Sequence, residues 1–205
     1  MITKEELQNY LKENQHDKIV AGADEILQEG DDDLKHGLGL AYFHQKKFAD
    51  ATPVFLQLAE KHNRSISWFN VCTAAAGERN FQLADEAYKK IQAILPYEKH
   101  HAGMMPLSMI TFYYMHALTE AENYAAAFPL AEKIKNFYKA LFITGNHYVV
   151  TRGLPLLQQF LETVNRIFEH MDDKEKIKNW FADFRSGVDE EGKEKLEAAE
   201  KSISS

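Results

Sequence analysis

The sequence predicts an all-α fold built from stacked antiparallel helix hairpins, and three observations lead to that prediction. Residues 37–59 recur in outline at 70–92, with Ala51 aligned to Ala84 at a spacing of 33. Apolar residues in both segments follow the i, i+3, i+4, i+7 spacing of an amphipathic helix. No run of alternating β-branched residues is long enough to form a sheet. Self-similarity at this period is typical of stacked supersecondary units rather than of one globular core.

The N-terminal segment, residues 1–30, is expected to form a degenerate leading hairpin. Thr3 is a candidate N-cap for a first helix over about 3–13, because acidic residues follow it directly. After a polar break, a second helix should cover about 18–29 and end at Gly30. Terminal repeats are commonly atypical, since their outer face meets water.

Residues 32–64 and 65–98 are the two clearest hairpins. The acidic run Asp31–Asp33 precedes the first of them and suits a helix N-terminus, where the macrodipole favours negative charge. In this hairpin two amphipathic stripes meet at the short polar break Lys46–Lys47. The stripes are Leu38, Ala41, Tyr42 and Gln45, then Phe48, Ala51, Phe55 and Leu58. Gly39 carries no side chain, so the neighbouring helix should approach it closely.

Both segments resemble the tetratricopeptide repeat, a 34-residue helix–turn–helix unit. The first carries Leu38-Gly39, Tyr42, Phe48, Ala51 and Phe55 of its signature, with Lys35 and Asn63 in place of its Trp and Pro. The second carries Trp68, Phe81, Ala84, Tyr88, Ile91 and Pro96, with Val71-Cys72 in place of Leu-Gly. The resemblance implies a right-handed superhelical α-solenoid that forms a single domain over residues 1–205.

A third, divergent unit is expected at 108–141. It keeps the second-helix positions Tyr124, Ala127, Ala131 and Ile134, whereas Tyr114-Met115 replaces Leu-Gly. The spacing from Ala84 to Ala127 is 43 residues, which indicates an insertion near 99–107.

The C-terminal third, residues 154–201, is expected to form capping helices. Pro155 fits the first turn of a helix over about 154–171, and a second helix should run from Asp172-Asp173 to Gly187. Their apolar stripes are Leu156, Leu157, Phe160, Leu161, Val164, Ile167 and Phe168, then Ile177, Trp180, Phe181 and Phe184. The same stripes would also serve a homodimer through 154–184. Residues 188–201 are expected to form a solvated terminal helix or to fray, and 142–153 are left unassigned apart from a turn at Thr144–Asn146.

Composition excludes several classes of partner. The net charge of −7 and the lack of a Lys/Arg cluster argue against nucleic acid, whose affinity depends on neutralising phosphates. No stretch approaches the roughly 20 apolar residues of a membrane-spanning helix. The N-terminus lacks the apolar region of a signal peptide, so the expected location is the cytoplasm. The single cysteine, Cys72, falls on an apolar helix face and is expected to be buried.

No constellation for catalysis stands out. His36 and His44 lie eight residues apart, but the nine histidines include no pair with metal-ligand spacing. Glycine-rich phosphate loops and nucleophile elbows are also missing from the sequence. We therefore expect no enzymatic activity, no metal and no cofactor, and the histidine count alone keeps a His-dependent enzyme as an alternative.

The resemblance implies one candidate site, a concave groove lined by the first helix of each hairpin. Carrying its positions across gives His36, Leu40, Phe43 and His44, then Ile66, Phe69 and Thr73, then Met109, Phe112 and His116. Such an apolar and aromatic surface suits a peptide or helix anchored by apolar side chains. The alternative is that these rings are interior packing, or that the chain's own C-terminal helix covers them.

One variant of the family holds a C-terminal carboxylate with Lys, Asn and Arg at five groove positions. The corresponding residues here are His36, Leu40, Asn70, Met109 and Tyr113, of which only Asn70 agrees. Recognition of such a tail is therefore not expected.

The sequence favours a non-catalytic adaptor that binds a protein segment in an apolar groove. Two alternatives stay open: a dedicated chaperone or immunity-type protein for one partner, and a self-associating structural module.

Overall fold

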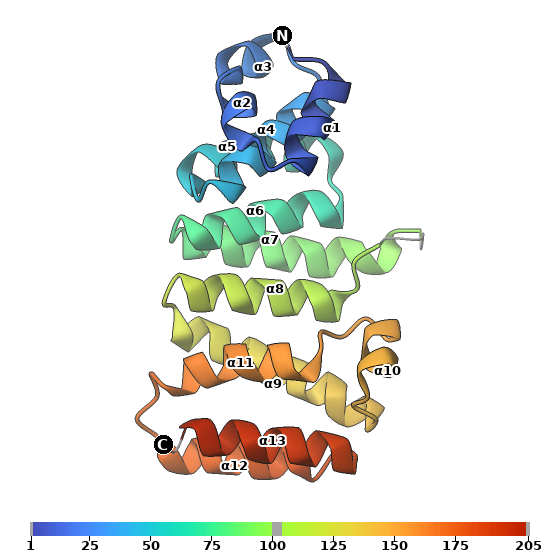
Figure 1. Cartoon of the computed structure of the whole chain (residues 1–205), viewed down its shortest axis with the longest axis vertical. Coiled ribbons are helices and arrows are strands. Elements are labelled where there is room, and N and C mark those ends of the chain that lie inside the picture. The colour runs from blue at the N-terminus through green and yellow to red at the C-terminus, as the bar shows by residue number, and fades with distance from the viewer. Residues whose placement is uncertain (1, 100–103, 204–205) are drawn as a thin grey trace. The chain divides into compact units, whose positions relative to one another are not determined.

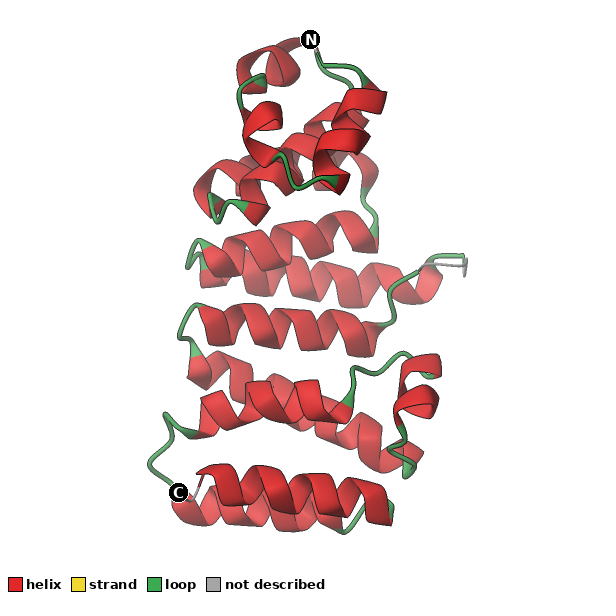
Figure 2. Ribbon diagram, viewed as in Figure 1, coloured by secondary structure: helices red, strands yellow, loops and turns green. Residues whose placement is uncertain are grey.

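The computed structural model describes residues 2–99 and 104–203, and every regular element within them is helical. Figures 1 and 2 show helices joined by short loops, with no strand in the described part of the chain. The predicted all-α fold class is therefore confirmed. The chain divides into two compact units, Met1–His101 and Ala102–Ser205.

The first unit is a succession of helices in which each packs on its neighbours. Its elements are α1 (Lys4–Lys12), α2 (His16–Val20), α3 (Ala23–Glu29), α4 (Asp32–His44), α5 (Phe48–His62), α6 (Ser65–Gly77), α7 (Phe81–Ile94) and the 3₁₀ helix η1 (Leu95–Tyr97). Helices α4 to α7 pack in sequence order, and α1, α2 and α3 all contact α4. The predicted hairpins 32–64 and 65–98 correspond to α4–α5 and α6–α7.

The leading segment differs from its prediction. A single helix over 18–29 was expected, but α2 ends at Val20 and α3 begins at Ala23. Gly22 separates them, and its N–H donates to the carbonyl of Ile19 three residues back rather than four. Glycine is a poor helix former, which explains the break at this position. Ile19 and Ile26 lie on either side of it, and both are fully buried.

The turn between paired helices is the same in four hairpins. Its central residue has a positive φ in each case: Asn14, Lys46, Arg79 and Glu122, at 55°, 58°, 67° and 62°. The hydrogen bonds also match, as in Lys46 N to Phe43 O and Lys47 N to Tyr42 O, both 2.9 Å. This 6→1 and 5→2 pattern is the Schellman motif, here without its usual glycine. Lys46 and Arg79 are 33 residues apart, so the turns repeat with the period of the sequence.

Glycines allow neighbouring helices of the first unit to approach closely, for example Gly39 inside α4 and Gly77 at the end of α6. A Cβ on Gly39 would lie 2.5 Å from the Phe55 ring, and one on Gly77 would lie 2.7 Å from the Phe48 ring. Contacts this short do not occur between packed side chains. The expectation that Gly39 allows the close approach of the next helix is therefore confirmed.

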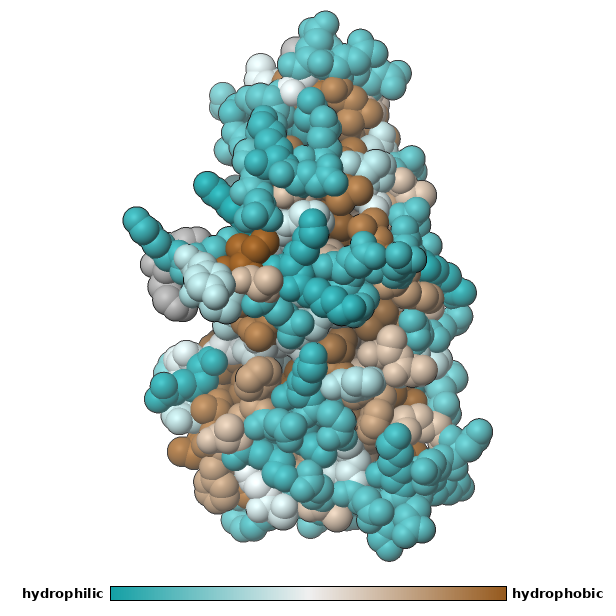
Figure 3. All heavy atoms as spheres, turned by 180° about the vertical axis from the view of Figure 1, so that it is seen from behind, coloured by the Kyte–Doolittle hydropathy of each residue, from teal (hydrophilic) through white to brown (hydrophobic). Residues whose placement is uncertain are grey.

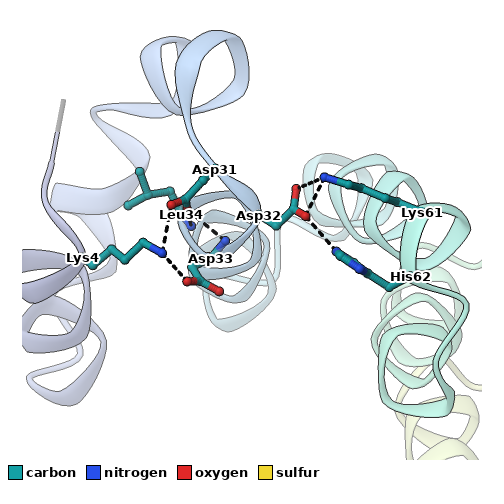
Figure 4. A network of polar contacts seen from close by, with 7 residues as sticks. All are labelled: Lys4, Asp31, Asp32, Asp33, Leu34, Lys61 and His62. Atoms are coloured by element: carbon teal, nitrogen blue, oxygen red, sulfur yellow. Dashed lines mark hydrogen bonds and ion pairs between the residues drawn. The ribbon is translucent and has the colours of Figure 1, made fainter.

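The acidic run before α4 joins three helices (Figure 4). Asp31 is the N-cap, and its carboxylate accepts from the backbone N–H groups of Asp33 and Leu34. Lys4 of α1 pairs with Asp31 at 2.9 Å, and Asp32 accepts from Lys61 of α5 at 2.7 Å. The predicted capping role is confirmed, and the exposed ion pairs add little stability individually.

The second unit is also all-helical. Its elements are α8 (Leu107–Glu120), α9 (Tyr124–Leu141), α10 (Asn146–Thr151), α11 (Leu157–Phe168), α12 (Lys174–Arg185) and α13 (Glu190–Ile203). The predicted third hairpin corresponds to α8–α9. Residues 142–153, which the sequence left unassigned, contain the short helix α10.

The first C-terminal helix is shorter than predicted. Pro155 was expected in its first turn, but α11 begins at Leu157 and its N-cap is Leu156. The carbonyl of Pro155 instead accepts a hydrogen bond from the Tyr138 hydroxyl of α9. This bond ties the end of α9 to the segment before α11.

The apolar stripes of α11 and α12 form the core of the second unit. Phe160, Phe168, Trp180 and Phe184 pack in an aromatic cluster with ring centroids 5.1–6.2 Å apart, and each is at most 3% exposed. Helix α13 packs against both α11 and α12, so it neither frays nor stands alone in solvent. Because most of these side chains are buried inside the unit, they do not support the predicted homodimer through 154–184.

Candidate functional site

The predicted groove positions of the first unit lie on α4 and α6. His36 of α4 and Asn70 of α6 approach each other, with 3.0 Å between Nε2 and Nδ2. The two residues are 34 positions apart, so the bond joins equivalent turns of successive hairpins. Leu40 follows His36 by one helical turn, and Phe69 and Ile66 lie beside Asn70 on α6. We call Leu40, Ile66 and Phe69, with the His36–Asn70 bond, the α4–α6 surface.

This surface is apolar and partly open to solvent. Ile66 is 47% exposed, and Leu40 and Phe69 are half-buried. Thr73, also predicted to line the groove, is buried, and its hydroxyl donates to the carbonyls of Phe69 and Asn70. A hydroxyl satisfied within its own helix is not available to a ligand. Thr73 is therefore removed from the site.

Two other predicted residues of α4 face different neighbours. Phe43 packs edge-on against Phe48 of α5 with centroids 5.3 Å apart. His44 stacks on His16 of α2 at 4.8 Å, with the rings 6° from parallel. The expectation that His44 lines the groove is not met, because its ring belongs to the packing of the N-terminal helices. Phe43 contacts His44 and lies at the edge of the α4–α6 surface at most.

The remaining predicted residues belong to α8 in the second unit. Phe112 is only 8% exposed and packs against the rings of Tyr113 and His116. Met109 and His116 are half-buried. The expectation that Phe112 offers an accessible ring to a partner is wrong, and the alternative of interior packing holds for it.

His36 is exposed at the surface, but its ring is partly shielded from water, and this favours the neutral form. Removal of its ring from water lowers the pKa of His36, and the charge of Asp33 opposes this only in part. A neutral imidazole accepts a hydrogen bond, which suits the amide of Asn70 as donor. The sequence placed Asn70 only among the carboxylate-clamp positions, although its spacing from His36 already pointed to this bond.

The chemistry of the rest of the described chain is limited. Within residues 2–99 and 104–203, no group of three His, Cys, Asp or Glu side chains is arranged to hold a metal ion. Burial, and less strongly the charge of Asp85, raises the pKa of Cys72 well above its usual value. None of the helices in these ranges combines the length and the apolar character needed to cross a bilayer.

The sequence did not identify a second apolar surface, which lies in the second unit. Phe142, Ile143 and Val150 are 55%, 44% and 56% exposed, and they come from α10 and the segment before it. Figure 3 shows brown and tan surface in this region, at the lower left. The short α10 has too few residues to give a clear helical period, so its exposed face carried no sequence signal.

A scan of protein-family models, a search of curated proteins and a search of solved structures each returned no significant match to this chain.

Proposed function

We propose that this chain is a non-catalytic scaffold of the tetratricopeptide-repeat type, acting in the cytoplasm, which binds an apolar segment of a partner protein on the α4–α6 surface. The observation that carries the proposal is the His36–Asn70 bond between equivalent turns of α4 and α6. Leu40 lies one helical turn after His36 on α4, and Ile66 lies one turn before Asn70 on α6. Together with Phe69 they are at least partly accessible.

The repeated turns support the scaffold part of the proposal. Four hairpins share one Schellman turn, and two of these turns recur at the sequence period of 33. Repeated hairpins of this kind stack their helices and leave one helix of each pair to line a common face. A right-handed solenoid over the whole chain is part of this proposal.

The chemistry of the surface suggests a partner with apolar anchors. Leu40, Ile66 and Phe69 present aliphatic and aromatic groups, and burying them would contribute roughly 25 cal/mol per Å² of apolar area. An amphipathic helix or an extended segment with apolar residues on one side would provide such contacts. A C-terminal carboxylate has no cationic clamp in this set of residues.

The experiment compares wild-type protein with two charge-introducing variants as bait for host proteins. Ile66→Glu places a carboxylate on the α4–α6 surface, whereas Leu27→Glu makes the same change at a 41% exposed position on α3. Both residues are exposed, so both variants should fold. We expect one host protein to be captured by the wild type and by Leu27→Glu but not by Ile66→Glu. Once purified, that protein should bind Ile66→Glu at least about tenfold more weakly than it binds the wild type.

A bait series in which Ile66→Glu and Leu27→Glu recover the same proteins in the same amounts would contradict the proposal. Recovery of the chain itself as the only specific partner would instead support the self-associating module.

A further inference from the structure

The contact between α2 and α4 is built on two stacked histidines. His16 is the first residue of α2 and His44 the last of α4, and their parallel rings are 4.8 Å apart. Next to them, Gln45 donates to the Asp17 carboxylate at 2.7 Å. The helices α2 and α4 pack together (Figure 1). The C-terminal end of α4 meets the start of α2 through this ring stack and hydrogen bond.

The stack tolerates neutral rings better than charged ones. His16 Nδ1 is buried and has no hydrogen-bond partner in the described part of the chain. Protonation would turn this nitrogen into a buried N–H donor without an acceptor, on a ring that also carries charge. Two imidazolium rings at this separation would in addition repel each other.

One acceptor near the pair is unused: Gln45 Oε1, next to His44 in the chain, is buried and has no hydrogen-bond partner among the described residues. Among the described residues, neither ring forms an ion pair with a carboxylate. Charged residues near this contact in the sequence include Lys12 and Glu13 at the end of α1, Asp17 and Lys18 on α2, Asp24 and Glu25 on α3, Lys46 and Lys47 after α4, and Asp50 on α5. The Asp17 carboxylate accepts a hydrogen bond from Gln45. The helix dipole at the C-terminal end of α4 stabilises a cation only modestly. Burial, and then the charge of His16, lower the pKa of His44.

Loosening this contact has a structural consequence. The helices α1, α2 and α3 are nine, five and seven residues long, too short to be stable without tertiary contacts. They cover a core cluster with α4 that consists of Leu7, Ile19, Ile26, Leu34, Leu38 and Ala41. Opening α2 away from α4 would expose this cluster.

We propose that the His16–His44 stack is a pH-sensitive contact whose protonation releases the N-terminal helices from α4. The contact is intact at neutral pH and weakens as pH falls through the usual range of histidine titration. The proposal does not depend on what binds the α4–α6 surface.

Amide hydrogen exchange of the full chain tests the proposal, with protection factors for α1–α3 compared at pH 7.5 and 5.5. His44→Phe keeps an aromatic ring in the stack but cannot be protonated. His147→Phe changes an exposed histidine of α10 and serves as the matched control. We expect the wild type and His147→Phe to lose at least about threefold in protection at pH 5.5, because the closed contact takes up protons less readily than the open one. His44→Phe should lose clearly less protection than the wild type, because only His16 can still be protonated and no second imidazolium repels it.

An equal loss in the wild type and His44→Phe would overturn the proposal. If His44→Phe does not fold, NMR titration of the ring protons of His16 and His44 in the wild type decides the question. Coupled titration curves with the His44 midpoint below about 6.5 support the proposal, and two independent curves near about 6.5 overturn it.

Discussion

The backbone N–H of Ile143 donates to the carbonyl of Leu141 at 2.8 Å, closing a three-residue turn centred on Phe142. Phe142 has φ 65° and ψ −46°, a conformation that is rare and strained for a residue with a side chain. The segment is held in place by Asp189, the residue before α13, which donates its backbone N–H to the Phe142 carbonyl. The Asp189 carboxylate also accepts from Thr144.

Replacing Phe142 with glycine should therefore stabilise the protein. Phe142 is 55% exposed, so little packing is lost, and glycine relieves strain of about 1–3 kcal/mol. Greater freedom of the unfolded chain offsets about 0.5–1 kcal/mol of this gain. We expect the free energy of unfolding of Phe142→Gly, measured with urea, to exceed that of Phe142→Ala by about 1 kcal/mol, since alanine keeps the strain. Equal stabilities of the two variants would show that the turn is not strained.

Gly39 offers a second test, in the opposite direction. Its added Cβ would lie 2.5 Å from Phe55, which is 2% exposed and has no room to move. We expect Gly39→Ala to lower the free energy of unfolding by about 1–2 kcal/mol, because overpacking outweighs the better helix propensity of alanine. Gly22→Ala is the control, since its Cβ would lie 3.7 Å from the Ile19 carbonyl oxygen. Thermal unfolding should leave that control within about 0.5 kcal/mol of the wild type.

Asp183 should matter more than an ordinary surface carboxylate. It pairs with Lys139 at 2.6 Å and with Lys135 at 2.9 Å, and the Lys135 side chain is only 6% exposed. Removing it leaves Lys135 with Glu132 as its ion-pair partner among the described residues. We expect Asp183→Ala to cost about 1–3 kcal/mol in urea unfolding. Asp85→Ala breaks an exposed ion pair with Lys89, and its free energy of unfolding should be close to that of the wild type.

The same residue predicts an acid dependence. Hydrogen bonds from Lys139, and next from Lys135, lower the pKa of Asp183 against the opposing effect of burial. The unfolded chain then takes up this proton at higher pH than the folded protein does, so the contribution to stability is full above about pH 4. It declines as pH falls toward the folded pKa. The stability difference between the wild type and Asp183→Asn should shrink from pH 6 to pH 3, and a constant difference would contradict this.

The His36–Asn70 bond predicts an energetic coupling between α4 and α6. In a double-mutant cycle with His36→Ala and Asn70→Ala, we expect a coupling of about 0.5–1 kcal/mol at pH 7.5. A parallel cycle that pairs Asn70→Ala with Gln82→Ala should be additive, because Gln82 bonds Glu86 on α7 instead. If the effects are additive in both cycles, the His36–Asn70 bond does not contribute to stability, and the α4–α6 surface as a binding site loses this support.

The sequence predicted the helices of the first unit well where a hairpin has strong periodicity and a polar turn. It failed at Gly22, where one glycine ended a helix whose apolar pattern continues to Ile26. The sequence also placed Pro155 in the first turn of a helix, whereas α11 begins two residues later, at Leu157. A proline fits equally well in the first turn of a helix and just before it. The Pro155 carbonyl accepts from the Tyr138 hydroxyl, and such a long-range bond leaves no local signal in the sequence.

The site was predicted less completely than the fold. Groove positions carried over from the repeat family predicted Leu40, Ile66 and Phe69, which are at least partly accessible. The same positions also predicted Thr73 and Phe112, which are buried. Spacing alone does not tell which neighbour covers a side chain. His44 shows this most clearly, since its partner His16 lies in a helix that was predicted to begin two residues later.

The burial of Cys72 has a practical consequence for spectroscopy. It is the only thiol in the chain, it is fully covered, and its raised pKa keeps it protonated at neutral pH. Maleimide reagents attack the thiolate, so the native protein should be nearly inert toward them. A cysteine introduced at the exposed turn position 79 would then be the one reactive point, and a dye attached there would report on the first unit with the native thiol left in place.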